Sequence, residues 1–337
     1  MNLLIWGAGA IGGTIGAFLA RAGHQVALVD RVREHVDAIR TRGLSITGPI
    51  DEFTVQAPAY TLDNIAGRYQ TILLCVKGHH TQAATRALLP YLGTEGCVVS
   101  VQNGLNELVI GEIVGENRTV GAFINFGSDY MEPGVIHFGG RGAVVLGEVD
   151  GKITERIQQL HHTLQDFDEN AVLTSHIWGY LWGKLAYAAM LFATALTNES
   201  MADAFAAPAY RQVYTVLAQE VLRVAAAKGI SPKPFNGFDP RAFIPGADIA
   251  LAISSLDDLV AFNRRSAKTH SGIWRDLAVR KRRTEVDSQL GPVVSNGAQL
   301  DIPTPLNARL IELIHEIEDG KRPQITTNLD LLKEMIV

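Results

Sequence analysis

The stretch that decides the fold stands near the start of the chain, where residues 2–12 read Asn2-Leu3-Leu4-Ile5-Trp6-Gly7-Ala8-Gly9-Ala10-Ile11-Gly12. Its apolar run is short and ends at a glycine, a pattern that predicts a buried strand. Residues 11–22 then show the apolar spacing of a helix and stop before Gly23, a residue type common at helix C-termini. The glycines are therefore predicted to form the loop between a strand and a helix.

The loop matches the pattern G-x-G-x-x-G in the context that this pattern requires. Its first glycine permits a tight turn, its second lets the backbone approach a pyrophosphate, and its third lets the helix pack closely on the strand. The N-terminus of the helix offers free N–H groups and the positive end of the helix dipole to phosphates. The alternative is a glycine turn in an unrelated α/β fold. We predict a dinucleotide bound by Gly7, Ala8, Gly9, Ala10, Ile11 and Gly12.

The end of the second predicted strand, residues 25–29, bears on which dinucleotide binds. Asp30 follows it, and a carboxylate there would accept hydrogen bonds from the ribose hydroxyls of NAD and repel the 2′-phosphate of NADP. Arg31 and Arg33 come next and could bind that phosphate, although exposure in a solvated loop is the alternative for both arginines. The two signals compete, so we expect NAD(P)H as cofactor with a slight preference for NAD.

Farther along the chain, strand and helix patterns alternate as in a parallel sheet covered by helices on both faces. Helices are predicted at 33–42, 81–91 and 153–167, and strands at 71–76, 97–101 and 171–174. Short β runs at 119–126, 134–138 and 143–146 are separated by glycines, which predicts a more antiparallel extension. After residue 176 only helices are predicted, at 179–198, 209–228, 247–264, 284–299, 305–319 and 328–336. The fold class is therefore an α/β Rossmann domain over 1–174, followed by an all-α domain over 175–337.

Two polar residues follow predicted strands at the edge where a doubly wound sheet binds its ligands. Lys77 comes just after 71–76, and Asn103 stands in the turn after 97–101. A lysine there can meet a cofactor hydroxyl or a substrate carboxylate, and an asparagine can bind near the nicotinamide. Ordinary turn chemistry is the alternative, because Asn-Gly and Lys-Gly are common turn dipeptides. We expect both residues to contact the cofactor, and Asn103 to contact the substrate as well.

Among the polar residues in the second half of the chain, Lys184 says most about function. Its neighbours in the predicted helix are apolar nearly all round, so its ammonium group either reaches toward solvent or is partly buried. A lysine tuned by partial burial is a suitable general acid for an alkoxide formed by hydride transfer. Farther on, the basic residues 280–283 precede Glu285. These residues read either as a solvated loop that opens a helix or as the edge of a cleft that holds Glu285.

Composition excludes several classes of protein. The 337 residues carry a net charge of −5, which argues against a general nucleic-acid binder. No stretch reaches the roughly 20 apolar residues of a membrane span, and the start of the chain lacks the basic and long apolar regions of a secretory signal. Two cysteines are too few for a disulfide framework, and the ten histidines show no metal-binding spacing. We expect a cytoplasmic protein without a bound metal, which could form a homodimer through its apolar helices.

Taken together, the glycine loop, Val76-Lys77, Gln102-Asn103-Gly104, Trp182-Gly183-Lys184-Leu185 and Arg283-Thr284-Glu285-Val286-Asp287 resemble the ketopantoate reductase (2-dehydropantoate 2-reductase) family. The resemblance covers essentially the whole chain. It implies a helical domain like the C-terminal domain of 6-phosphogluconate dehydrogenases, and NAD(P)H-dependent reduction of a 2-oxo acid. It also implies that Lys184 is the general acid, that Glu285 binds the substrate hydroxyl, and that Ser271 contacts the substrate.

The chain departs from the family pattern close to these residues. The family usually has asparagines one and two helical turns after the lysine, where this chain has Ala188 and Phe192. The segment 268–274 around Ser271 also differs from the usual serine-rich stretch. We therefore expect ketopantoate or a related 2-oxo acid as substrate. The alternatives are another hydroxyacid or opine-type dehydrogenase of this architecture, and a sensor that binds NAD(P) without turnover.

Overall fold

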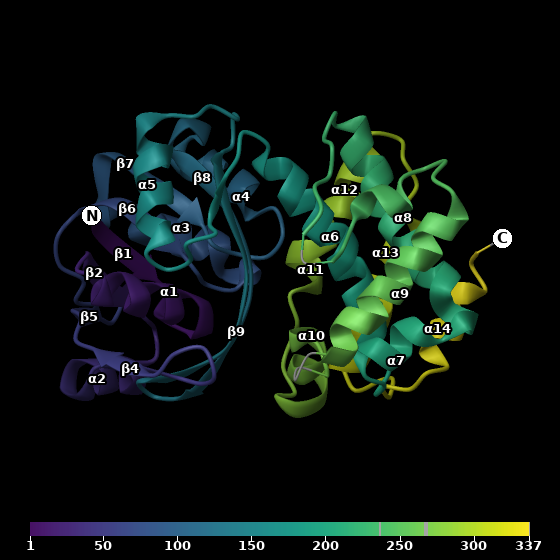
Figure 1. The fold of residues 1–337 in the computed structure, drawn as a ribbon, viewed down its shortest axis with the longest axis horizontal. Coiled ribbons are helices and arrows are strands. Elements are labelled where there is room, and N and C mark those ends of the chain that lie inside the picture. The colour runs from purple at the N-terminus through teal and green to yellow at the C-terminus, as the bar shows by residue number, and fades with distance from the viewer. Residues whose placement is uncertain (236, 266–268, 337) are drawn as a thin grey trace. The chain divides into compact units, whose positions relative to one another are not determined.

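The chain forms two compact units, Met1–Ile177 and Trp178–Val337, in a computed structural model that describes residues 1–235, 237–265 and 269–336 (Figure 1). The expected domain boundary between residues 174 and 175 lies shortly before this division. Helix α6, Ile177–Thr194, starts inside the first unit, because the side chain of Ile177 packs against Gly121 and Gly147 of the sheet.

The first unit is built on one 10-stranded sheet with the order β4-β3-β9-β8-β7-β6-β1-β2-β5, and β10 pairs with β9. From β5 to β8 the neighbouring strands are parallel, and β9 runs antiparallel to β8. The strand order reverses at β1, which is the topology of a Rossmann sheet. The strands are β1 Asn2–Trp6, β2 Gln25–Val29, β3 Leu44–Thr47, β4 Phe53–Val55, β5 Ala59–Tyr60, β6 Tyr69–Leu74, β7 Leu92–Ser100, β8 Thr119–Glu132, β9 Val135–Glu148 and β10 Val172–Leu173.

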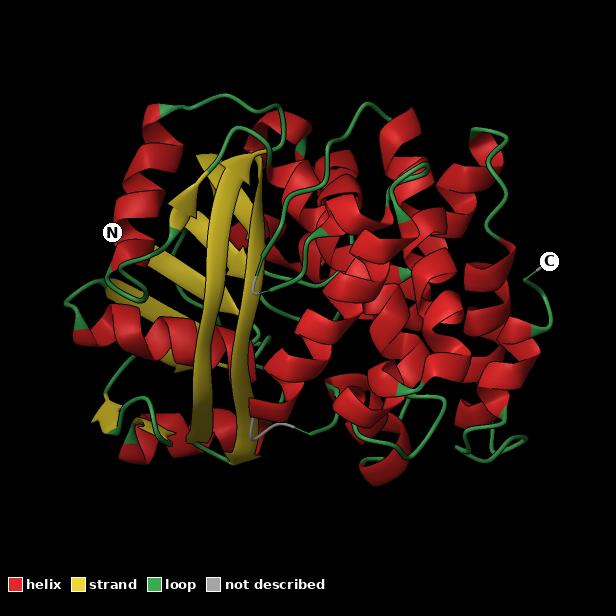
Figure 2. Ribbon diagram, turned by 45° about the vertical axis from the view of Figure 1, so that its right-hand side comes forward, coloured by secondary structure: helices red, strands yellow, loops and turns green. Residues whose placement is uncertain are grey.

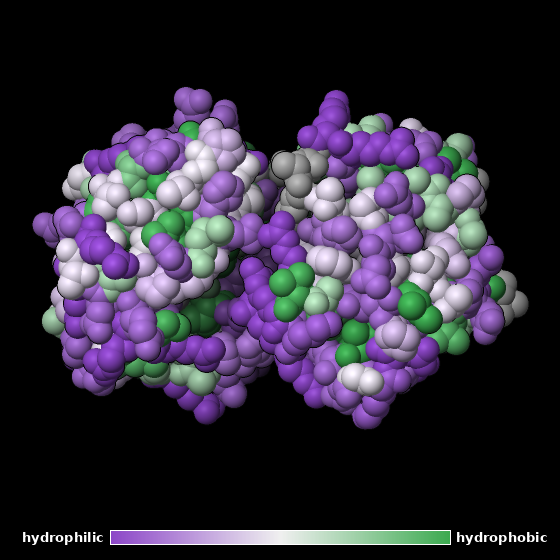
Figure 3. All heavy atoms as spheres, turned by 90° about the horizontal axis from the view of Figure 1, so that it is seen from below, coloured by the Kyte–Doolittle hydropathy of each residue, from purple (hydrophilic) through white to green (hydrophobic). Residues whose placement is uncertain are grey.

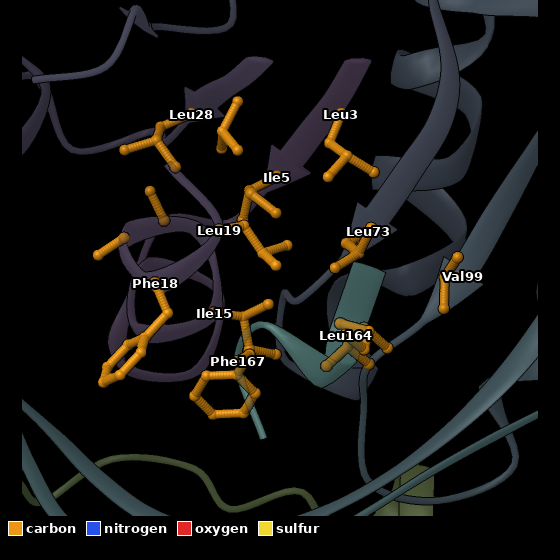
Figure 4. Close-up of a cluster of buried hydrophobic side chains, with 14 of the residues drawn as sticks. Leu3, Ile5, Ile15, Phe18, Leu19, Leu28, Leu73, Val99, Leu164 and Phe167 are labelled. Carbon is orange, nitrogen blue, oxygen red and sulfur yellow. The ribbon is translucent and has the colours of Figure 1, made fainter. Parts of the chain in front are cut away.

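Helices cover both faces of this sheet, because its central strands are apolar on both sides. On β1, Leu3 and Ile5 belong to one core cluster and Leu4 and Trp6 to another. Figure 4 shows the first cluster, to which α1 and α5 contribute residues such as Ile15 and Leu164, while α3 and α4 contribute to the second. The helices are α1 Ala10–Arg21, α2 Arg33–Arg42, α3 Thr81–Leu88, α4 Asn106–Val114 and α5 Glu155–Gln165.

The predicted pair of short strands at 134–138 and 143–146 is wrong: the structure has the single long strand β9. The glycines that suggested interruptions lie inside the β8–β9 hairpin instead. A Cβ atom on Gly142 would stand 1.7 Å from the carbonyl oxygen of Asn125, so this glycine allows close backbone approach where the register shifts. A glycine within a strand marks such an irregularity as often as it marks a turn.

The described residues of the second unit form helices, apart from one isolated bridge between Phe235 and Phe238 (Figure 2, helices in red). The predicted helix 284–299 is wrong in one respect, because it divides into α11 and α12 beside Pro292, which has no N–H for the helical hydrogen bond. Besides α6, the helices are α7 Met201–Ala206, α8 Arg211–Ala227, α9 Ile249–Arg265, α10 Gly272–Trp274, α11 Val286–Gln289, α12 Gly291–Gln299, α13 Pro305–Glu318 and α14 Asn328–Lys333.

The surface is mostly hydrophilic on the face that Figure 3 shows, with hydrophobic side chains in scattered groups. Scattered exposed apolar residues are normal for a folded chain in water. Within the described part of the chain, no helix combines the length and the apolar character that a membrane span requires.

Candidate functional site

Four parallel strands end in register at one edge of the sheet. Trp6 of β1 pairs with Val29 of β2 and with Leu74 of β6, and Leu74 pairs with Ser100 of β7. The segments that leave these strands carry the residues predicted from sequence: the glycine loop, Asp30, Lys77 and Asn103. The register therefore brings all the predicted cofactor residues to the same edge of the first unit.

The glycine loop has the geometry that its pattern predicts. Gly7 has a φ of +102°, which favours glycine, and a Cβ atom there would lie 3.1 Å from the backbone nitrogen of Val76. A Cβ atom on Gly12 would lie 2.2 Å from the carbonyl oxygen of Gly7, so helix and loop pack in direct contact. Space is open around Gly9, where no heavy atom would lie within 4 Å of an added Cβ.

No side chain caps the first turn of α1, whose N-cap is Gly9. The amide N–H groups of a helix's first turn have no partner within the helix, and they carry the positive end of its dipole. Uncapped N–H groups beside open space fit a pyrophosphate, which is an anion with several acceptor oxygens. The residues present therefore fit the phosphates of a dinucleotide.

The residues after β2 interact with the segment after β6. One carboxylate oxygen of Asp30 accepts a hydrogen bond from the backbone N–H of Val32 at 2.9 Å. The Arg31 guanidinium lies 3.3 Å from Nε2 of His80, and Nε2 of His79 lies 3.1 Å from the same atom. Arg31 is therefore grouped with two imidazoles, whereas Arg33 makes only an exposed 3.5 Å ion pair with Asp63.

A buried hydrogen-bond network that sequence reasoning missed supports the turn that carries Asn103. The side-chain amide of Gln102 donates to the carbonyl of Val76 and to the hydroxyl of Thr81, both at 2.8 Å. Thr81 donates to Asn106 at 2.8 Å, and Asn106 donates to the carbonyl of Asn103 at 2.7 Å. Asn103 itself is exposed and Lys77 is half-buried. The signal in the sequence was Gln102 beside Asn103, with a threonine at the start of a helix.

Lys184 is half-buried on α6, a helix whose other residues are mostly buried. One side of this helix is covered closely by residues 231–233. A Cβ atom on Gly179 would lie 2.6 Å from the carbonyl oxygen of Ser231, and one on Gly183 would lie 2.8 Å from that of Lys233. These two glycines let residues 231–233 lie directly against the backbone of α6, next in sequence to Lys184.

The residues that follow Lys184 make its helix face apolar. Ala188 is 7% exposed and Phe192 is completely buried. Tyr187 packs edge-on against Phe235, and burial raises the pKa of Tyr187 to about 12, against a smaller lowering by its hydrogen bond with Asn263. The phenol therefore stays neutral at working pH, so Lys184 is the cationic group of this part of α6.

Glu285 and Ser271 lie on short segments of the second unit. Glu285 is half-buried and precedes the first residue of α11. Ser271 is 4% exposed, and its hydroxyl oxygen accepts a hydrogen bond from the backbone N–H of Trp274 at 3.1 Å. The hydroxyl proton of Ser271 is still available for a further acceptor. Lys268, the first residue of the segment that departs from the family pattern, lies outside the described residues.

Residues 280–283 lie in an exposed segment before α11, as the solvated-loop interpretation predicts, and its three arginines also form ion pairs. Arg280 and Arg282 both form ion pairs with the buried carboxylate of Asp276, at 3.0 and 2.9 Å. Arg283 pairs with Glu318 and Asp319, at 2.9 and 2.6 Å. Glu318 and Asp319 lie far from Arg283 in the sequence, so no local pattern predicts these two pairs, whereas Asp276 is only four and six residues from Arg280 and Arg282.

Both cysteines of the chain lie in the first unit. Cys75 and Cys97 are free thiols, and burial raises the pKa of both, so they stay protonated. Among the described residues no cluster of three or more histidine, cysteine or acidic side chains could hold a metal ion.

A Rossmann sheet with an open phosphate loop, followed by a helical unit with a half-buried lysine, defines the class of nicotinamide-dependent oxidoreductases. Family comparison makes this assignment specific. The model of the family described as "Ketopantoate reductase PanE/ApbA" matches residues 3–151, and the model of its C-terminal domain matches residues 176–318. The chain therefore belongs to the ketopantoate reductase family, and the predicted family and fold class are confirmed.

Individual relatives agree with the family match. The 2-dehydropantoate 2-reductase of Halobacterium salinarum is 26% identical over 320 residues, which cover 93% of this chain and 98% of that protein. The enzyme of the same name from Pyrococcus horikoshii is 27% identical over 317 residues, which cover 93% of this chain and 96% of that protein. The chain is accordingly an oxidoreductase that acts on CH–OH groups with NAD(P)H.

Solved structures show the same fold. A PanE/ApbA family ketopantoate reductase from Ralstonia eutropha has a TM-score of 0.80 at 28% identity, and the match covers 95% of this chain and 99% of that one. D-Mandelate dehydrogenase, solved with NADH and anilino(oxo)acetate, has a TM-score of 0.82 at 22% identity with the same coverage. The second match is evidence for the fold alone.

Proposed function

We propose that this chain reduces ketopantoate to pantoate, or a related 2-oxo acid to its 2-hydroxy acid, with Lys184 as the general acid. The observation that carries the proposal is the placement of the half-buried Lys184 on α6, a helix whose other residues are mostly buried and which has no other charged side chain. An ammonium held in such surroundings is ready to give up a proton to a nearby developing anion. The family match supports the reaction type.

In the proposed reaction, the bound nicotinamide supplies a hydride to the carbonyl carbon. The carbonyl oxygen then gains negative charge, and Lys184 donates a proton to it. Glu285 accepts a hydrogen bond from a substrate hydroxyl, and Ser271 donates its free hydroxyl proton to a substrate oxygen. Asn103 and Lys77 contact the cofactor, and Asn103 also contacts the substrate. The network of Gln102, Thr81 and Asn106 keeps the Asn103 turn in place.

The cofactor is bound by the residues from Gly7 to Gly12, and the choice between NADH and NADPH rests on the residues after β2. Asp30 favours the ribose of NAD, as its position at the strand end predicts. The grouping of Arg31 with His79 and His80 acts in the opposite direction, because a 2′-phosphate would find a guanidinium and two imidazoles there. We keep the slight preference for NADH as a prediction, and the ratio of the two Michaelis constants tests it. A strong preference for NADPH would contradict it.

The substrate side of the proposal allows a more apolar acid than ketopantoate. Ala188 and Phe192 offer no hydrogen bond where the family usually has asparagines. With Glu285 as the proposed partner of one substrate hydroxyl, the site has fewer other hydrogen-bonding groups and so gains less from further polar groups on the acid. D-Mandelate dehydrogenase, a structural neighbour, was solved with the aromatic ligand anilino(oxo)acetate. Aromatic and branched 2-oxo acids therefore belong in the assay beside ketopantoate.

The decisive experiment is a panel of 2-oxo acids with NADH and with NADPH, followed by loss of the absorbance of the reduced cofactor. The proposal expects turnover of at least one acid. Oxidation only in the presence of an amine would favour an opine-type dehydrogenase. Tight cofactor binding with no oxidation across the panel would favour a sensor and would contradict the proposal.

The role of Lys184 is tested by the variant Lys184→Ala with the wild-type substrate. We expect kcat to fall by a factor of about 100 or more, the usual contribution of a positioned general acid, while the dissociation constant of NAD(P)H changes little. Lys228→Ala is the matched control, because Lys228 is an exposed lysine of the same unit bonded to Asn296. Nearly intact turnover in Lys184→Ala would show that another group supplies the proton.

Two further expectations concern the cellular location and the oligomeric state of the enzyme. We propose a cytoplasmic location, which the two free cysteines support because thiols persist in reducing compartments. A homodimer stays a prediction, and sedimentation of the purified protein tests it.

A further inference from the structure

His35 is a buried histidine of α2 that the proposed reaction does not use. Its side chain is 1% exposed, and both of its ring nitrogens are bonded. Nε2 lies 2.8 Å from the carbonyl oxygen of Ala8, and the backbone N–H of Gly134 lies 2.9 Å from Nδ1. His35 therefore connects the glycine loop to the turn between β8 and β9.

The chemistry of the partners determines the form of this imidazole. A carbonyl oxygen only accepts, so Nε2 must carry the proton that it donates to Ala8. A backbone N–H only donates, so Nδ1 must be the unprotonated acceptor for Gly134. Each nitrogen has one suitable partner, and an amide or alkyl side chain would not satisfy both from the same position.

A second contact joins the same hairpin to the same loop. The hydroxyl of Ser128 on β8 lies 3.1 Å from the carbonyl oxygen of Ala10 and 2.8 Å from the hydroxyl of Thr14. Ile136 of β9 also packs on the start of α1, where a Cβ atom on Gly13 would lie 2.3 Å from its side chain. The hairpin thus contacts the loop and the start of α1 directly through Ser128 and Ile136, and it reaches the carbonyl of Ala8 through His35.

We propose that the β8–β9 hairpin braces the dinucleotide loop through His35, which makes His35 a positioning residue for cofactor binding. The peptide bond is planar, so the carbonyl of Ala8 and the N–H of Gly9 lie in one plane. In a trans peptide these two groups point in opposite directions, so a hydrogen bond that holds the carbonyl of Ala8 also fixes the direction of the N–H of Gly9. This inference rests on the proposed role of the loop in binding NAD(P)H.

Two variants of His35 separate the two hydrogen bonds. Glutamine reaches about as far as Nε2, so His35→Gln can still donate to Ala8 and loses the acceptor for Gly134. Asparagine reaches about as far as Nδ1, so His35→Asn keeps that acceptor and loses the donor. We expect His35→Asn to raise the dissociation constant and the KM of NAD(P)H about tenfold, which is about 1.4 kcal/mol, with kcat changed less than about threefold. His35→Gln should stay within about threefold of wild type.

His161→Asn is the matched control, because His161 donates from Nε2 to the carbonyl of Ala171 at 2.8 Å in the same unit, away from the loop. It should leave cofactor binding unchanged. Equal effects of Asn and Gln at position 35, or no effect of Asn, would overturn the brace. If His35→Asn does not fold, Ser128→Ala tests the brace instead. We expect it to raise the dissociation constant of NAD(P)H about threefold, and an unchanged dissociation constant would contradict the brace.

Direct titration of the wild type by NADH and NADPH fluorescence distinguishes this inference from the proposed function. A wild type that binds neither cofactor contradicts the cofactor role of the loop. A wild type that binds, together with variants that bind equally well, contradicts only the brace.

Discussion

At the scale of single residues, several buried polar side chains of this chain satisfy particular backbone groups. Glu220 of α8 is the clearest case outside the site. Its carboxylate accepts hydrogen bonds from the backbone N–H groups of Leu306 and Asn307, at 3.0 and 2.9 Å, and from the side chain of Asn307. It therefore caps α13, because the side chain of the N-cap residue Thr304 makes no cap hydrogen bond.

Replacement of Glu220 should destabilise the helical unit. Burial raises the pKa of Glu220, and the hydrogen bonds from residues 306 and 307 oppose that rise. Glu220→Ala leaves three buried donors without an acceptor, so we expect the free energy of unfolding to fall by about 3 kcal/mol. Urea unfolding measures it. Glu312→Ala, which removes a 63% exposed partner of Arg309, should cost less than about 1 kcal/mol. Similar losses in both variants would contradict the capping role.

At the scale of elements, three glycines of the loop between β1 and α1 differ in what their missing side chains allow. Gly7 and Gly12 lie against other backbone atoms, whereas Gly9 faces open space. The first two therefore serve the packing of helix on strand, and Gly9 serves the approach of a ligand. Substitution of Gly7 or Gly12 should therefore reduce the stability of the fold, whereas substitution of Gly9 should reduce the binding of the cofactor.

Two alanine variants test this distinction. Gly12→Ala would place a Cβ atom 2.2 Å from the carbonyl oxygen of Gly7, so α1 must move, and we expect a loss of about 1–3 kcal/mol in unfolding free energy. Gly9→Ala meets no atom of the chain and should fold with nearly wild-type stability. Its methyl group enters the space proposed for the pyrophosphate, so the dissociation constant of NAD(P)H should rise at least about tenfold. A Gly9→Ala protein that binds normally would show that the phosphates lie elsewhere.

At the scale of the whole molecule, the chain consists of two compact units. The proposed phosphate loop belongs entirely to the first unit, and Lys184 belongs to the second. A ligand stabilises only the state to which it binds, by RT ln(1 + [L]/Kd), which is about 2.7 kcal/mol at a concentration of 100 Kd.

Calorimetry should therefore show an unequal response of the two units. We expect NAD(P)H, at about 100 times its dissociation constant, to raise the melting temperature of the transition of the α/β unit by several degrees. The transition of the helical unit should shift less. Gly9→Ala is the control, because a tenfold weaker affinity lowers the stabilisation at the same ligand concentration to about 1.4 kcal/mol, which should roughly halve the shift while leaving both transitions in place. A larger shift of the helical unit would assign the main cofactor contacts to that unit.

The sequence by itself determined the fold class, the family and the glycine loop, because each depends on local order: a strand, a turn and a helix follow one another within a few residues. It also located most helices and the parallel strands, whose apolar periodicity is strong. It missed β3, β4 and β5, which are short, and α4, whose apolar pattern continues from the turn before it.

Only the tertiary structure decided which distant groups meet. The partners of Arg283, the capping of α13 by Glu220 and the position of His35 between Ala8 and Gly134 all join residues that no local pattern connects. The physical reason is that a side chain's hydrogen bonds depend on distance in space, whereas periodicity reports only the burial of a face. The sequence thus identified residues of the glycine loop, and the packing of the hairpin and helix around the loop determines how they are held.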